Sequence, residues 1–235
     1  MAEVAVICVD SCYWVSRANG GKGLIRAQAE AIKFYCKEKL KIHPLNTVCL
    51  AAMGESPCFS EPTRDLEEIS SALKRLSYTG MMHIPIRRVM YYFNRSDLPK
   101  RRLVVFAGGL VLMGREFLGE CATAFKESNV AVDVINFGLQ GPRKKPYLQD
   151  YFLAAADNNG NCRYLYAPSG SRVSLSKQLE SSPIMPRVGE DEDGIALAAL
   201  ACLSMQKKRE PRTYRPIRED EDAEDVETLG MNKGK

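Results

Sequence analysis

The sequence has little of the chemistry that enzymes use. Only two of its 235 residues are histidines, His43 and His83, and neither lies beside a nucleophile motif. It has no G-x-S-x-G elbow and no G-x-G-x-x-G fingerprint after the first apolar run. The glycine-rich run at 20–23 is no phosphate-binding loop, because it lacks the hydroxyl residue that follows the lysine. We therefore predict a protein without catalytic residues and without a cofactor.

Disulfides, structural zinc and membrane insertion are not indicated either. None of the eight cysteines forms a C-x-x-C pair, and several, such as Cys8, lie inside apolar runs where a thiol behaves as a small hydrophobic side chain. No apolar run approaches the ~18 residues that cross a bilayer. The first residues also lack the charged and apolar regions of a signal peptide. We expect reduced thiols, no membrane contact, and a location in the cytoplasm and nucleus.

What the sequence does contain is a regular alternation of strand and helix patterns. Nearly continuous apolar runs are typical of strands buried on both faces, and they occur at 3–10, 46–53, 102–107 and 130–135, with a shorter one at 162–166. Helical spacing of apolar residues occurs between them, at 24–40, 63–76, 86–93, 115–128, 147–156 and 173–179. Thr63 is the predicted N-cap of the second helix.

This alternation predicts an α/β fold, a doubly wound and mostly parallel sheet flanked by helices on both faces as a three-layer sandwich. In such folds ligand sites lie at the carboxyl ends of the strands. That rule directs attention to Asp10, to Gly108 and Gly109, and to residues 136–138.

Two basic segments, 100–102 and 141–146, could contact phosphate. Aromatic residues do not interleave with these charges as they do in single-strand binders. We therefore expect solvated or docking surfaces here and no nucleic-acid partner.

The character of the chain changes after residue 186. Residues 190–193 are all acidic, 194–205 are apolar with high helix propensity, and 206–209 are mostly basic. Residues 210–235 are polar and charged, with few aromatics, which is typical of disorder. We divide the chain into an α/β domain at 1–186, a helix at 187–209 and a disordered tail at 210–235.

Several segments together resemble one family, the ubiquitin-receptor non-ATPase subunit of the proteasome regulatory particle. The most specific is the run from Asn129 to Gly138 (NVAVDVINFG), which is close to identical to that family's pattern. Residues 7–10 (ICVD) are similar to its first strand, Pro44 to Leu50 to its entry into the second strand, and 181–184 (SSPI) to the end of its domain.

The resemblance implies a von Willebrand factor A (VWA)-like domain that docks between the base and lid subunits of the proteasome. Metal-binding domains of this type carry a D-x-S-x-S motif after the first strand, but here Cys12 and Trp14 replace the two serines after Asp10. Ile84 stands in place of a threonine and Gly108-Gly109 in place of an aspartate. A thiol is a poor ligand for a hard cation. We therefore expect a degenerate site without metal, in which Asp10 caps a loop or binds backbone N–H groups.

The resemblance also implies that the 187–209 helix is a ubiquitin-interacting motif, which binds as a helix in a groove. Leu200 fills the position of the motif's alanine, which Ala199 or Ala201 could take only with a one-residue slip, and Lys207 to Arg209 replace its trailing acids. Two interpretations stay open: a weakened receptor for polyubiquitin, or an amphipathic helix that packs on a neighbouring subunit or remains free. The predicted contact residues are Glu190, Asp191, Glu192, Asp193, Leu197, Ala199, Leu200, Ala201, Ser204 and Met205.

Two other functions remain as alternatives. The first is a VWA scaffold of another intracellular complex, such as a transcription or DNA-repair factor, although that class usually adds a cysteine-rich zinc module that this sequence lacks. The second is an enzyme that uses Asp10 with a divalent cation.

Overall fold

The computed structural model describes residues 1–17, 21–53, 60–80, 83–168 and 170–185. The predicted helix at 187–209 and the tail at 210–235 lie outside the described residues. Within the described ranges no helix is both long enough and apolar enough to cross a membrane.

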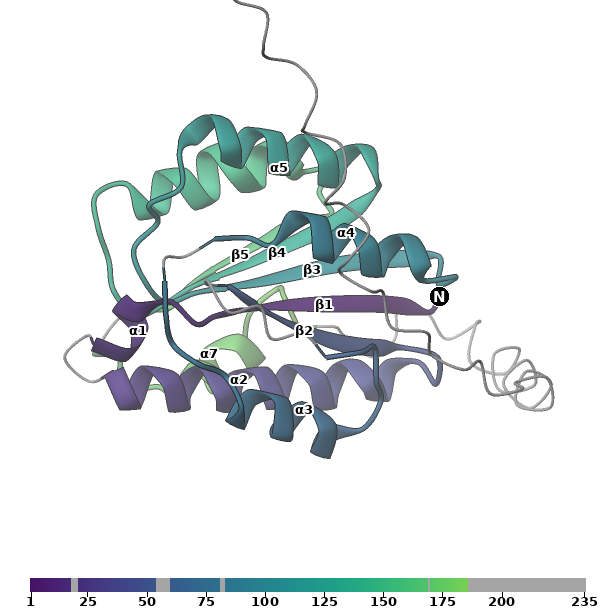
Figure 1. Cartoon of the computed structure of the whole chain (residues 1–235), viewed down its shortest axis with the longest axis horizontal. Coiled ribbons are helices and arrows are strands. Elements are labelled where there is room, and N and C mark those ends of the chain that lie inside the picture. Colours follow the sequence, from purple (N-terminus) through teal and green to yellow (C-terminus); the bar gives the residue numbers. More distant parts are fainter. Residues whose placement is uncertain (18–20, 54–59, 81–82, 169, 186–235) are drawn as a thin grey trace, which may run out of the picture.

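The centre of the molecule is a five-stranded sheet in which every neighbouring pair of strands is parallel. The strand order is β2-β1-β3-β4-β5 (Figure 1). The strands are β1 Glu3–Asp10, β2 Thr47–Met53, β3 Lys100–Ala107, β4 Val130–Asn136 and β5 Arg163–Tyr166. All residues of β1 and β4 are buried, as expected for strands covered on both faces. The predicted parallel sheet is confirmed.

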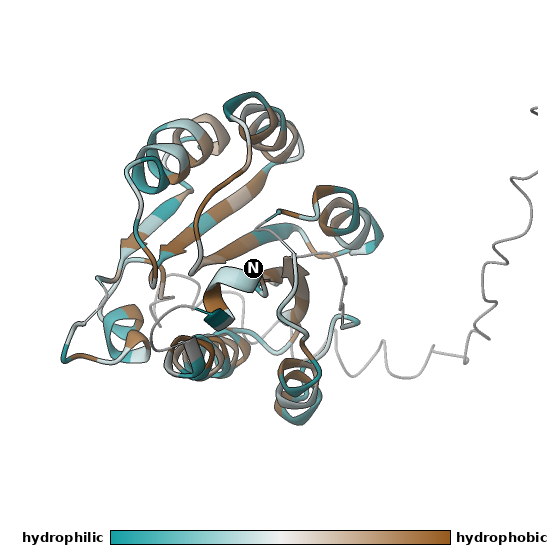
Figure 2. Cartoon of the chain, turned by 60° about the vertical axis from the view of Figure 1, so that its left-hand side comes forward, coloured by the Kyte–Doolittle hydropathy of each residue, from teal (hydrophilic) through white to brown (hydrophobic). Residues whose placement is uncertain are grey.

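Helices cover both faces of this sheet (Figures 1 and 2). One layer consists of α2 Gly21–Ile42, α3 Leu66–Lys74 and α7 Leu175–Glu180. The other consists of α4 Ile86–Arg95, α5 Arg115–Glu127, the π-helix η1 Pro146–Leu153 and the short α6 Ala154–Ala156. A short helix, α1 Tyr13–Arg17, follows the carboxyl end of β1. The three-layer α/β architecture is confirmed.

Alternation along the strands divides the core into two apolar clusters. Successive side chains of a strand point to opposite faces of the sheet. Cys8 and Val105 therefore pack with Phe125 under α5, whereas Ile7 and Val104 pack with the α2 side. In the α5 layer the rings of Phe125 and Phe152 meet edge to face, with centroids 6.4 Å apart.

Several predicted boundaries were wrong for local reasons. The first long helix begins at Gly21, so part of the glycine-rich run is helical. Asp65, not Thr63, caps α3: its Oδ1 accepts a hydrogen bond of 2.8 Å from the N–H of Glu67. Thr63 instead forms an antiparallel bridge with Val48, so it lies along the outer edge of β2. The predicted helix at 147–156 is a π-helix for most of its length.

Gly138 follows β4 where two loops approach closely. Its φ is +68°, and a Cβ there would lie 2.5 Å from the carbonyl oxygen of Gly108. That same oxygen accepts a hydrogen bond of 2.8 Å from the N–H of Leu139. The turn therefore requires both the left-handed conformation of glycine and its missing side chain.

We predict that Gly138→Ala lowers the free energy of unfolding by about 2 kcal/mol or more, through strain at positive φ together with the steric clash. Gly160→Ala is the matched control, because Gly160 has a φ of +77° but open space around its Cα. It should cost about 1 kcal/mol, from the backbone alone. Chemical denaturation of both variants measures the difference. Equal losses would contradict the close approach at Gly138.

Candidate functional site at the carboxyl edge of the sheet

The loops that follow β1, β3 and β4 meet at the carboxyl edge of the sheet, around the side chain of Asp10. Asp10 is completely buried at the end of β1. Gly108 and Gly109 come directly after β3, and Phe137 and Gly138 directly after β4. The structure thus brings together the residues that the sequence indicated for this edge.

Both carboxylate oxygens of Asp10 accept hydrogen bonds from the backbone. Oδ2 accepts from the N–H of Gly108 at 2.8 Å and of Gly109 at 2.7 Å, and Oδ1 accepts from the N–H of Cys12 at 3.0 Å. Charge-assisted bonds of this kind compensate for the burial of a carboxylate. These hydrogen bonds are the ones expected if Asp10 binds backbone N–H groups.

Gln28 of α2 fixes the backbone of the same residue. Its side-chain oxygen accepts from the N–H of Asp10 at 3.0 Å, and its side-chain nitrogen donates to the carbonyl of Asp10 at 3.0 Å. Gln28 is fully buried. This paired bond attaches the end of β1 to the helix layer and orients the Asp10 side chain toward Gly108 and Gly109.

The atoms around Asp10 do not fit a hard divalent cation. Burial, with Asp10 nearby, raises the pKa of Cys12 to about 12, so its sulfur is a neutral thiol. Ile84 is buried in the apolar core and offers no ligand atom. In the described part of the chain no three His, Cys, Asp or Glu residues are grouped as metal ligands. The donor set therefore gives no basis for metal chemistry at this edge.

A buried lysine lies beside the site. Lys144, in the loop after β4, is 1% exposed and donates to the carbonyls of Phe137 at 2.7 Å and Leu139 at 2.6 Å. Burial lowers its pKa to about 7, and the charge of Asp10 opposes this shift. The expectation that the whole 141–146 segment forms a solvated basic loop was therefore wrong for Lys144, which ties the loop to β4.

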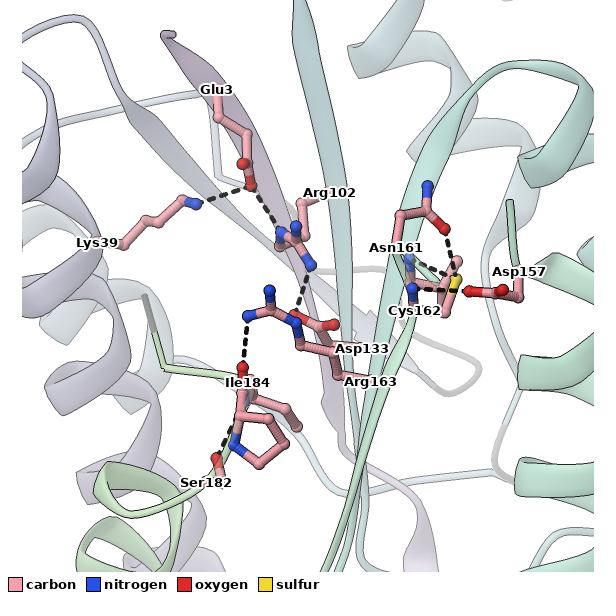
Figure 3. Close-up of polar contacts among 12 residues, drawn as sticks. Glu3, Lys39, Arg102, Asp133, Asp157, Asn161, Cys162, Arg163, Ser182 and Ile184 are labelled. Carbon is pink, nitrogen blue, oxygen red and sulfur yellow. Dashed lines mark hydrogen bonds and ion pairs between the residues drawn. The ribbon is translucent and has the colours of Figure 1, made fainter. Parts of the chain in front are cut away.

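A second polar cluster lies within the α2 side of the sheet, and sequence reasoning missed it (Figure 3). Glu3 pairs with Lys39 at 2.8 Å and with Arg102 at 2.9 Å, and Arg102 pairs with Asp133 at 2.9 Å. Strand register explains the cluster: Arg102 lies beside Ala5, two residues after Glu3, and Asp133 lies beside Val104. All three strand residues therefore face α2.

These charges also correct the expectation for the basic segment at 100–102. Arg102 is 17% exposed and its guanidinium points inward, between two carboxylates. Burial alone would raise the pKa of Glu3. The positive charges and hydrogen bonds of Lys39 and Arg102 outweigh this effect, so the pKa of Glu3 is lowered. Asp133 is fully buried, and burial raises its pKa to about 6 despite the pairing with Arg102. The sequence held one signal for this cluster: each of two apolar runs contains an acidic residue, Glu3 in 3–10 and Asp133 in 130–135.

Arg163, at the beginning of β5, connects the sheet to the last described segment of the chain. Its Nη1 donates to the carbonyl of Pro183, and Ser182 Oγ accepts from the N–H of Ile184 at 3.3 Å (Figure 3). The segment that ends the described residues is thus held against the beginning of β5. The predicted ubiquitin-contact residues, Glu190 to Met205, lie outside the described residues.

Comparison with known proteins gives consistent results. No protein-family model matches the sequence. A plant relative, "26S proteasome non-ATPase regulatory subunit 4 homolog" from Arabidopsis thaliana, is 27% identical over 188 residues, which are 77% of this chain and 48% of that protein. Fission yeast "26S proteasome regulatory subunit rpn10" is 26% identical over 240 residues, 95% of this chain and 97% of that protein. This chain spans about half the length of the relatives from plants, Dictyostelium and Schistosoma.

Solved structures agree on the fold. The crystal structure of the SpRpn10 VWA domain superposes with a TM-score of 0.67 at 26% identity, over 77% of this chain and 96% of that domain. A von Willebrand factor type A protein from Catenulispora acidiphila superposes with a TM-score of 0.57 at 15% identity, over 74% of this chain and 40% of that one, which shows the fold alone.

The described part of the chain is therefore a von Willebrand factor A-like domain, defined by its sheet order and by the Asp10 loop at the carboxyl edge. Within that class, its sequence and structure are similar to the Rpn10 or non-ATPase regulatory subunit 4 proteins of the 26S proteasome. The resemblance drawn from residues 129–138 is confirmed.

Asp133 predicts a pH dependence of stability. Its pKa is about 6 in the fold and about 3.9 in an unfolded chain. Between these values the folded state binds more protons, so the contribution of Asp133 to stability falls as the pH rises. Relative to Asp133→Asn, the wild type should gain about 1 kcal/mol of unfolding free energy between pH 7.5 and pH 5.

Denaturant unfolding of both proteins at the two pH values measures this relative gain. Asp157→Asn is a control: backbone N–H donors lower the pKa of Asp157, so the wild type should not gain relative to that variant. A wild type that loses stability relative to Asp133→Asn as the pH falls would show that Arg102 keeps Asp133 ionised.

Proposed function

We propose that this chain is a non-ATPase subunit of the 26S proteasome regulatory particle. The observation that carries the proposal is the similarity to fission yeast Rpn10, which extends over 95% of this chain and 97% of that protein. The VWA fold alone would not suffice, because one fold serves many functions. Here the similarity also includes the region that follows the domain.

In this proposal the VWA domain at 1–186 is a rigid docking module between the base and lid subcomplexes, in the cytoplasm and nucleus. The buried parallel sheet and the polar clusters toward its two ends support a rigid body. A non-catalytic role is supported by the Asp10 site, where the carboxylate oxygens accept backbone hydrogen bonds and the thiol of Cys12 is kept protonated.

The segment at 187–209 is proposed as a helix that receives polyubiquitinated substrates with reduced affinity, and 210–235 as a disordered tail. The acidic lead at 190–193 and the spacing of Leu197 and Ser204 support ubiquitin binding. Leu200 and the basic run at 207–209 reduce it, because ubiquitin-interacting motifs carry alanine and acids there. A basic end that faces a basic surface weakens association.

We predict that the tagged full chain co-fractionates with both base and lid subunits when a native lysate is separated by size. A chain ending at residue 186 should still co-fractionate, since docking is assigned to the domain. Recovery of the full chain as a free protein would contradict the proposal. Recovery in a complex without proteasome subunits would favour the alternative VWA scaffold.

We predict weak binding of ubiquitin to the full chain, strengthened several-fold by Leu200→Ala, because a small residue lets the helix approach the apolar patch of ubiquitin. NMR titration of labelled ubiquitin measures both affinities. Ala199→Gly, beside the contact position in the family register, is a control that should not strengthen binding. If Leu200→Ala weakens binding or leaves it unchanged, the register is slipped or the helix has another role.

A further inference from the structure

The described loops that follow β1, β3, β4 and β5 at the carboxyl edge of the sheet carry no exposed negative charge, and the loop after β2, at 54–59, lies outside the described residues. In the described residues of the loops that follow β1, β3, β4 and β5, at 11–12, 108–114, 137–145 and 167–174, the sequence contains no Asp or Glu. The neighbouring carboxylate of Asp10 is fully buried and accepts three backbone hydrogen bonds. Glu116, in the first turn of α5, is the first exposed acid after the β3 loop.

Exposed cations surround the same edge. Arg143 and Lys145 flank the buried Lys144 in the loop after β4, Arg172 follows β5, and Arg17 ends α1. Clustered charge of one sign creates a potential that attracts the opposite charge. The part of the carboxyl edge formed by these described loops is therefore a positive surface.

Exposed apolar side chains lie on this positive surface. Tyr13 and Trp14 of α1 are 43% and 40% exposed, and Leu112 of the β3 loop is 53% exposed. The guanidinium of Arg17 lies 5.0 Å from the centre of the Tyr13 ring. The Cβ of Trp14 is packed close to Gly109, at the end of β3. Aromatic residues with arginine are the composition typical of the centre of an interface.

The chain itself contains a segment of complementary charge. Six of the seven residues at 219–225 (EDEDAED) are acidic. The described chain ends near the beginning of β5, where Arg163 holds Pro183. A β1-sized strand of eight residues is about 26 Å long. The 33 residues of 186–218 can span up to about 110 Å, so the acidic segment can reach the opposite edge.

We propose that the acidic segment 219–225 docks on the carboxyl edge of its own VWA domain, between the cations of the 141–146 loop and the aromatic pair Tyr13 and Trp14. Because the segment is tethered, its effective concentration is in the millimolar range. A weak, salt-sensitive contact is therefore enough to occupy the edge. The docked tail would compete with any acidic partner for this surface. The inference does not depend on the assignment to the proteasome.

Trp14 is the only tryptophan of the chain, so its fluorescence reports directly on the occupancy of this edge. We expect acrylamide to quench the full wild-type chain about twofold less at low salt than a chain with a neutral segment. In 0.5 M NaCl the wild type should be quenched as strongly as that variant. The neutral segment carries Glu219→Gln, Asp220→Asn, Glu221→Gln, Asp222→Asn, Glu224→Gln and Asp225→Asn.

A charge cycle and a matched control complete the test. Arg143→Glu with Lys145→Glu should remove the protection of Trp14, and replacing the six acids by lysine in that background should restore it. Neutralising the other acidic run, at 190–193, should leave the protection unchanged. Equal quenching of the wild type and the neutral-segment variant would overturn the proposal. Protection that rises with protein concentration would also overturn it and indicate a second copy as the occupant.

Discussion

The fold depends most directly on the burial of one carboxylate at the end of β1. Asp10 is removed from water, and in addition to the bond from Cys12 its carboxylate accepts hydrogen bonds from the N–H groups of Gly108 and Gly109. These donors are 98 and 99 residues away in the sequence. The bond therefore joins the first and third strands at their carboxyl ends, and Gln28 joins the same point to α2.

Two other buried carboxylates, those of Glu3 and Asp133, also need polar partners inside the fold. Glu3 and Asp133 lie inside apolar strands, where an unpaired charge would cost several kcal/mol. Arg102 stands between them, and Lys39 reaches Glu3 from α2. The two polar clusters lie toward opposite ends of the same strands, so a slip in register would leave buried charges without partners. Such clusters add little to net stability. Their main effect is to favour one register of strand pairing over the others.

The fold was predictable from the sequence because it rests on local patterns. Apolar runs such as 3–10 and 130–135 identify buried strands directly, and their alternation with helices implies the parallel order. The short α1 was missed because its five residues show too few turns for a helical period. Thr63 was misassigned because both it and Asp65 are good capping residues. Thr63 pairs with Val48 of β2, and this tertiary contact leaves Asp65 as the N-cap of α3.

The site was less predictable, because it depends on partners distant in the sequence. That Asp10 would bind backbone N–H groups was one of two open interpretations, and no residue pattern identified the donors. Lys144 has two charged neighbours in sequence, and nothing local distinguishes the one that turns inward to the carbonyls of Phe137 and Leu139. Burial of Arg102 follows only from the register of β3 with β1 and β4.

The internal use of Asp10 changes what this edge of a VWA domain can recognise. Where a bound cation is the contact, affinity comes from one strong and directional bond to a ligand oxygen. Here the charge of Asp10 is balanced inside the protein, by backbone N–H groups with Lys144 nearby, and the outer surface retains cations and aromatic side chains. Recognition at such a surface depends on summed charge and apolar contact. Such recognition is less directional and more sensitive to salt.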